Sequence, residues 1–103
     1  MLNYCNEIEK TIMRYSDEFT IFAQDADYQR SVSFCLMQIG ELSNGLSEEF
    51  KQETKGLIPW PAIKAMRNMV AHDYGNVDQE KIWYTAHDDI KELKRFCQQQ
   101  ILR

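Results

Sequence analysis

Five polar side chains fall within the eight residues 67–74, beside the apolar residues Met66 and Val70; they are Arg67, Asn68, His72, Asp73 and Tyr74. In a helix, Asn68 and His72 are one turn apart and share a face. Arg67 and Tyr74 are two turns apart and nearly in register if the helix extends that far. The segment therefore gathers a fixed cation, an amide, a phenol and an imidazole that titrates near neutrality.

This set of side chains suits cleavage of an RNA phosphodiester without a metal ion. RNA carries its own nucleophile, the 2′-hydroxyl, so the protein needs only to move protons and to stabilise charge on the phosphate. His72 is the candidate general base or acid, and Arg67 would neutralise the transition state through its planar donor fork. Asn68 can orient His72 or donate to a phosphate oxygen, and Tyr74 can hydrogen-bond the substrate or the histidine.

A structural interpretation of the same segment stays open. His72, near a helix C-terminus, could interact only with the helix dipole, and Arg67 could pair with an acidic residue of a neighbouring helix such as Glu41. No His/Asp/Glu cluster accompanies Asp73 in the sequence, so we predict no bound metal and no cofactor. His87 follows Trp83 by one turn of another helix, where packing or solvation is its expected role.

Composition points to one ordinary globular domain spanning residues 1–103. No apolar run approaches the roughly 20 residues of a membrane span, and the N-terminus lacks the pattern of a secretory signal, so we expect a cytoplasmic protein without membrane insertion. A net charge of -4 argues against general nucleic-acid binding. An RNA site must then be local, with a few cations that pairing of two subunits could supplement.

The spacing of apolar residues predicts an all-α fold, and it defines the first two helices. The first runs from Leu2 to about Tyr15, and Phe19 and Phe22 are candidates to extend its apolar stripe. The second starts after Asp27 as N-cap. Its predicted core positions are Tyr28, Val32, Cys35, Leu36, Ile39, Leu42 and Leu46. Gly40 interrupts this stripe, which indicates a close helix-helix approach.

Capping signals define the remaining helices. Ser47 caps a short third helix that ends before Lys55-Gly56. Pro59-Trp60-Pro61 opens a fourth, with core positions Ile63, Met66 and Val70, and Gly75-Asn76 ends it. Asp78 caps the last helix, whose predicted buried residues are Ile82, Trp83, Ala86, Ile90, Leu93, Phe96 and Cys97. The prediction is a single-domain antiparallel bundle of four main helices and one short helix, in which Cys5, Cys35 and Cys97 are buried free thiols.

The segment Arg67-x-x-x-x-His72-x-Tyr74 resembles the R-x-x-x-x-H-x-Y signature of the HepT-like branch of the HEPN domain superfamily. Further landmarks of that family occur in the same order along the chain: Ile39-Gly40-Glu41, Ile58-Pro59-Trp60, Met66-Arg67-Asn68, Val77-Asp78 and Ile82-Trp83. The resemblance thus spans nearly the whole chain. It departs from the family at Leu42-Ser43, where members often carry small residues such as alanine, and this difference affects packing more than catalysis.

The resemblance implies an all-helical HEPN domain that forms a homodimer, so that two copies of the motif line one cleft. It implies a metal-independent endoribonuclease toxin of a type VII toxin-antitoxin system, with Arg67 and His72 as the catalytic pair. The implied antitoxin is a minimal nucleotidyltransferase that silences the toxin by transferring AMP to Tyr74. A bulky anion on Tyr74 would occupy the cationic patch that RNA phosphate needs. In a dimer, Arg67, Lys64 and their symmetry mates would share one groove despite the acidic chain.

The sequence is compatible with three functions. The leading hypothesis is the ribonuclease toxin, in which replacement of Arg67 or His72 abolishes RNA cleavage. The alternative is a noncatalytic helical adaptor that binds a minimal nucleotidyltransferase or a nucleotide through the same patch. A structural helical dimer without an active site is the third, and the density of polar groups around His72 counts against it.

Overall fold

The computed structural model describes residues 1–101, and its regular elements within that range are all helical. Three long helices are single elements: α1 (Leu2–Tyr15), α3 (Ala26–Asn44) and α5 (Trp60–Asp73). The fourth long helix is made of three consecutive elements: α6 (Gln79–Tyr84), a π-helical turn (Thr85–Asp89) and α7 (Ile90–Ile101). The short elements are α2 (Phe19–Gln24), α4 (Glu48–Glu53) and a 3-10 turn (Tyr74–Asn76).

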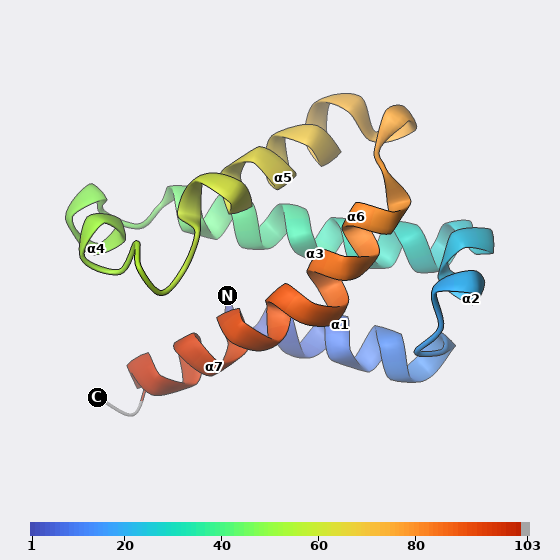
Figure 1. Ribbon diagram of the computed structural model, residues 1–103, viewed down its shortest axis with the longest axis horizontal. Coiled ribbons are helices and arrows are strands. Elements are labelled where there is room, and N and C mark those ends of the chain that lie inside the picture. The colour runs from blue at the N-terminus through green and yellow to red at the C-terminus, as the bar shows by residue number, and fades with distance from the viewer. Residues whose placement is uncertain (102–103) are drawn as a thin grey trace.

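The long helix α3 crosses the middle of the molecule and organises the bundle (Figure 1). It packs against α5 on one side and against α1 on the other, and α1 also contacts α7. Successive long helices run in opposite directions (Figure 1). The fully buried side chains between them include Ile8, Phe22, Tyr28, Val32, Ile39 and Ile82. These contacts confirm the all-α antiparallel bundle, and no helix within residues 1–101 is long and apolar enough to cross a bilayer.

The segment after α1 differs from the prediction, because Phe19 and Phe22 belong to a separate short helix instead of continuing the first one. The backbone becomes extended at Ser16, and the Tyr28 hydroxyl fixes this break by donating to the Ser16 carbonyl oxygen at 2.8 Å. Phe22 turns into the core, where its ring centroid lies 5.0 Å from that of Tyr28 and 5.3 Å from that of Trp83. The bundle therefore has two short α-helices, not one.

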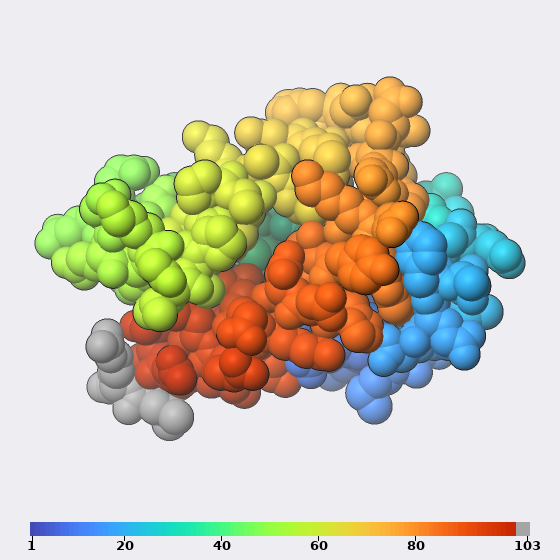
Figure 2. All heavy atoms as spheres, viewed as in Figure 1, coloured from blue at the N-terminus to red at the C-terminus, as the bar shows by residue number. Residues whose placement is uncertain are grey.

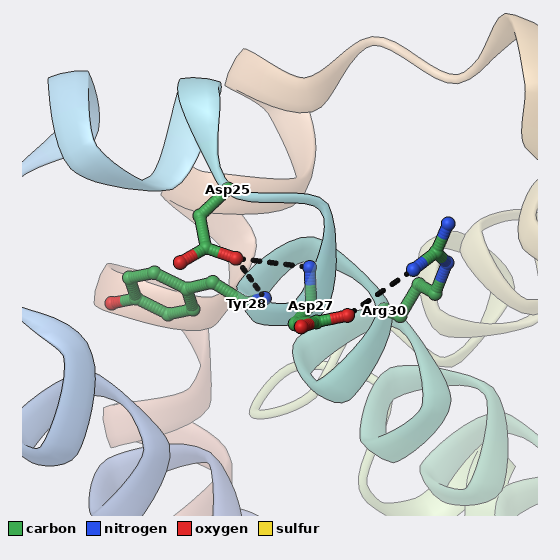
Figure 3. A network of polar contacts seen from close by, with 4 residues as sticks. All are labelled: Asp25, Asp27, Tyr28 and Arg30. Atoms are coloured by element: carbon green, nitrogen blue, oxygen red, sulfur yellow. Dashed lines mark hydrogen bonds and ion pairs between the residues drawn. The ribbon is translucent and has the colours of Figure 1, made fainter.

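The start of α3 also differs from the prediction. Asp25, not Asp27, is the N-cap: its Oδ1 accepts from the backbone N–H of Asp27 at 3.0 Å and of Tyr28 at 3.1 Å (Figure 3). Asp27 already lies in the first turn of the helix and pairs with Arg30 at 3.2 Å. Both aspartates satisfy the sequence preference for an N-cap, so only the backbone geometry distinguishes them.

Most of the predicted core positions are buried. The prediction that Leu42 is a core residue is wrong, since 43% of its surface is exposed. Helices α1 and α5 cover two sides of α3, and Leu42 lies on a side that neither helix covers. Leu46, Ile63 and Cys97 are only partly buried and pack at the edge of the core. The predicted caps at Ser47 and Asp78 are confirmed, because their side chains accept from backbone N–H groups of α4 and α6.

His87 has a structural environment, as its position one turn after Trp83 suggested. Its ring stacks on the indole of Trp83 with centroids 5.3 Å apart. Its Nε2 lies 2.7 Å from a carboxylate oxygen of Asp17 and its Nδ1 lies 2.8 Å from one of Asp88. His87 thus ties the loop between α1 and α2 to the π-helical turn.

The cysteines lead to a prediction about thiol reactivity. Cys5 and Cys35 are buried and Cys97 is partly buried, all as free thiols, and burial raises the pKa of Cys5 to about 12. The reactive species is the thiolate. We therefore expect Ellman's reagent at pH 8 to leave Cys5 and Cys35 unmodified in the folded protein and to modify all three thiols in urea.

Two additional results would bear on the thiol prediction. Any slow reaction of the folded protein should disappear in Cys97→Ser, and rapid modification of all three native thiols would contradict the buried placement.

Because the raised pKa keeps Cys5 protonated in the folded state, its contribution to stability is present below pH 9 and is lost as the pH rises towards 12. The urea midpoint should accordingly be lower at pH 10 than at pH 7.5.

Candidate functional site

The candidate site lies on α5, and the first turn of this helix is firmly anchored. Trp60 is buried, and its indole Nε1 donates to Thr54 Oγ1 at 2.9 Å. Met66 and Val70 turn towards the core, so the opposite side of α5 faces outward. Residues spaced by four positions share that outer side, and the exposed ones are Lys64, Asn68 and His72. We call these three residues the outer stripe of α5.

Arg67 lies where α5 crosses α3, directly opposite Gly40. A Cβ atom added to Gly40 would overlap the Cβ of Arg67 and would lie only 2.7 Å from its Cγ. The absence of a side chain at Gly40 thus lets the two helices approach closely, which confirms the predicted close contact and identifies its partner. The Arg67 side chain is held against α3 as a result.

The guanidinium of Arg67 is engaged by two side chains. Its Nε and Nη2 both contact Oε1 of Glu41 on α3, and its Nη1 donates to Oδ1 of Asn68 at 3.0 Å. The pairing with Glu41 that the sequence left open as an alternative is therefore present. Asn68 contacts Arg67, and within residues 1–101 its side chain makes no hydrogen bond to His72.

His72 is in the last turn of α5 and is exposed. Within the described part of the chain, its imidazole makes no hydrogen bond or ion pair, so both ring nitrogens face solvent or a ligand. The adjacent Asp73 is directed elsewhere, because its Oδ1 accepts from Asn76 Nδ2 at 2.8 Å. Among residues 1–101, no group of three or more His, Cys, Asp or Glu side chains is placed to hold a metal ion.

A continuous helix would have placed Tyr74 nearly in register with Arg67, but the helix ends before Tyr74. Helix α5 ends at Asp73, whose φ of -148° and ψ of 41° depart from helical geometry, and Tyr74 begins the 3-10 turn. The register of Arg67 and Tyr74 that an uninterrupted helix predicts is therefore not realised. Tyr74 is half-buried and packs against the edge of the core, only two residues beyond His72.

An apolar hollow of about 420 Å³ lies on another side of α5, towards α6 and α7. Figure 2 shows this hollow between the yellow and the orange-red parts of the surface. Its walls include Ile63, Met66 and Met69 from α5 and Leu93 from α7, with Leu36 and Ile39 of α3 at its base. Arg67, Asn68 and His72 do not line it, so the hollow is separate from the polar side chains of the candidate site.

A comparison with protein families matches residues 1–100 to the family described as ribonuclease HepT-like. The match covers nearly the whole chain and includes the helices that carry Gly40, Glu41, Arg67 and His72. The protein therefore belongs to the HepT-like ribonuclease family. Its fold and its resemblance to this family agree with the predictions from the sequence.

Individual relatives carry provisional names as RNases. One from Methanocaldococcus jannaschii is 29% identical over 93 residues, which cover 82% of this chain and 79% of the relative. Another, from Caldanaerobacter subterraneus subsp. tengcongensis, is 34% identical over 77 residues, which cover 75% of this chain and 68% of the relative. No solved structure matches the chain.

Proposed function

We propose that the protein is an endoribonuclease whose catalytic pair is Arg67 and His72 and whose chemistry needs no metal ion. The observation that carries this proposal is the arrangement on α5: an exposed imidazole that is unpaired within residues 1–101 and lies one turn from Asn68, which itself bonds the guanidinium of Arg67. Membership of a ribonuclease family supports RNA as the substrate. The other histidine, His87, is committed to Trp83, Asp17 and Asp88.

The reaction is a transfer of the phosphodiester to the neighbouring 2′-oxygen. His72, as neutral imidazole, takes the proton of the 2′-hydroxyl, and the 2′-oxygen forms a bond to phosphorus. The bond from phosphorus to the 5′-oxygen breaks, and that oxygen is protonated as it leaves. The products are a 2′,3′-cyclic phosphate and a 5′-hydroxyl. Arg67 donates to the phosphate oxygens as their charge increases.

A homodimer would complete this site. The reaction needs one group to remove a proton and another to supply one, while each chain has a single unpaired histidine within residues 1–101. The outer stripe of α5 is open, so a second copy placed on it would form a cleft with a second His72. The same arrangement would bring together Arg67 and Lys64 from two chains and would offset the net charge of -4 locally.

We further propose that the protein is the toxin of a toxin-antitoxin pair and that a minimal nucleotidyltransferase silences it by adenylylating Tyr74. Tyr74 lies two residues after His72, and its half-buried ring leaves part of the side chain accessible. An AMP group on its hydroxyl would add a phosphate close to the cations of the site. This added anion would compete with RNA phosphate for Arg67.

The adenylylation proposal predicts a mass change. Coexpression with a cognate minimal nucleotidyltransferase should increase the intact mass by about 329 Da for each AMP added, and Tyr74→Phe should prevent the increase. Tyr84→Phe is the matched control, because Tyr84 is 55% exposed on α6 and lies outside the candidate site. An unchanged mass, or an increase that persists in Tyr74→Phe, would contradict the assignment of Tyr74.

The ion pair between Arg67 and Glu41 is the observation that favours the alternative function, a noncatalytic adaptor for a nucleotidyltransferase or a nucleotide. In an adaptor, this pair would have only a structural role. The purified protein would then bind its partner and leave RNA intact under every condition, whereas the proposed enzyme cleaves RNA.

A further inference from the structure

The contacts of Glu41 with Arg67 fix both the position and the orientation of the guanidinium. The two residues come from different helices, and the contact depends on the close crossing at Gly40. One carboxylate oxygen of Glu41 contacts both Nε and Nη2, and the Asn68 side-chain oxygen accepts from Nη1. An arginine at the surface ordinarily samples many rotamers, and here three of its nitrogen atoms are held.

The donors that remain define where an anion can bind. A guanidinium has five N–H donors. Nε donates to Glu41 and Nη1 donates to Asn68, while Nη2 contacts the same Glu41 oxygen. Each terminal nitrogen carries two N–H groups, so at least one on each is left, and donors on both terminal nitrogens match two oxygens of a phosphate. Arg67 therefore presents a fixed donor pair although its charge is partly compensated.

We propose that Glu41 is a positioning residue for Arg67, which aims the remaining donor pair of the guanidinium at the scissile phosphate. This inference rests on the proposed ribonuclease function. Stabilising the transition state depends on donors that are already oriented before charge develops. The negative charge of Glu41 opposes RNA binding in general. Its presence beside the cation is therefore explained by the orientation it gives Arg67, and not by an increase in affinity for RNA.

Two replacements of Glu41 separate orientation from charge. Glu41→Ala removes the acceptor, and the unrestrained Arg67 should lower kcat by about 100-fold, the loss typical of a misplaced catalytic group, without raising KM. Glu41→Gln keeps an acceptor oxygen and removes the charge, so it should retain most of kcat and lower KM. Rates are measured with a fluorescent RNA oligonucleotide, and Arg67→Ala is assayed in parallel.

Glu9→Ala is the matched control, because Glu9 forms another interhelical ion pair, with Lys94 at 2.9 Å. The two pairs are similarly exposed: the side chains of Lys94 and Glu9 are 26% and 39% exposed, and those of Arg67 and Glu41 are 25% and 45% exposed. Loss of an ion pair alone would affect both variants equally. The positioning role predicts a loss of kcat in Glu41→Ala only.

A second measurement tests the inference even if the protein cleaves no RNA. Exchange of the Arg67 Nε–H with water, followed by 15N NMR, should be slow in the wild type and in Glu41→Gln and fast in Glu41→Ala. An inactive wild type would overturn the proposed function, while fast Nε–H exchange in it would overturn the positioning role. Cleavage by Glu41→Ala at or above the wild-type rate would also overturn it, because Arg67 would then act on the phosphate without Glu41.

Discussion

Replacing His72 or Arg67 with alanine is expected to abolish RNA cleavage and to leave the fold intact. His72 is exposed, and its imidazole makes no hydrogen bond within residues 1–101, so its removal costs little stability. Loss of a general acid or base lowers the rate by about 10²–10⁴-fold. Arg67→Ala should have an effect of similar size through lost stabilisation of the phosphate. Cleavage rates and urea unfolding of the same preparations provide the measurement.

His87→Ala is the control for His72→Ala, because the chain has only these two histidines. It removes a ring that stacks on Trp83 and contacts the carboxylates of Asp17 and Asp88. Both carboxylates are largely exposed and screened, so we expect a loss of about 1 kcal/mol in the free energy of unfolding. Cleavage per folded molecule should stay at the wild-type level. Equal loss of activity in both histidine variants would contradict the assignment of His72.

Gly40→Ala is expected to affect both stability and cleavage. The added methyl group would overlap the Cβ of Arg67 and contact its Cγ, and backbone lies behind these atoms, so α3 and α5 must move apart. Overpacking of this kind costs about 1–3 kcal/mol. Because the displaced residue is Arg67 itself, cleavage should decrease more than the folded fraction does. Urea unfolding combined with kcat determined on the folded protein separates these two effects.

Gly56→Ala provides the comparison for Gly40→Ala. A Cβ atom at Gly56 meets no heavy atom within 4 Å, and no glycine within residues 1–101 has a positive φ. Its stability should change by less than about 0.5 kcal/mol, as is usual at an open surface position. If Gly40→Ala were as stable and as active as Gly56→Ala, the close crossing of α3 and α5 would be wrong.

The helical fold was predictable because its signals are local. Apolar spacing of three and four residues defines the buried faces, and Ser47, Asp78 and Pro59-Trp60-Pro61 define helix starts. The errors occur where local rules permit two answers. Phe19 and Phe22 continue the stripe of α1 in spacing, and the break before them depends on the distant Tyr28 hydroxyl.

The candidate site was predictable in its residue types and only partly in its geometry. Gly40 within an apolar stripe indicated a close helix contact, and Glu41 beside it was the natural partner for Arg67. The end of α5 could not be placed, because the backbone of Asp73 leaves the helix two residues before Gly75, the glycine that was expected to end it. Tyr74 is for this reason displaced from the register with Arg67.

The contact between Asn68 and Arg67 also escaped prediction. Spacing by four residues places Asn68 and His72 on the same face, and this is what the structure shows. The amide oxygen of Asn68 nevertheless accepts from Arg67, the preceding residue in sequence, because Glu41 holds the guanidinium within reach. Such a contact depends on a third residue from another helix, and helical periodicity carries no information about it.

The most direct test of the account is the cleavage of a fluorescent RNA of defined sequence in EDTA by the wild type and by His72→Ala, with mass analysis of the products. We predict that the wild type leaves 2′,3′-cyclic phosphate and 5′-hydroxyl ends, that His72→Ala leaves the RNA intact, and that a 2′-O-methyl group at the cleaved nucleotide blocks the reaction. Intact RNA with the wild type, or equal cleavage by His72→Ala, would contradict the account.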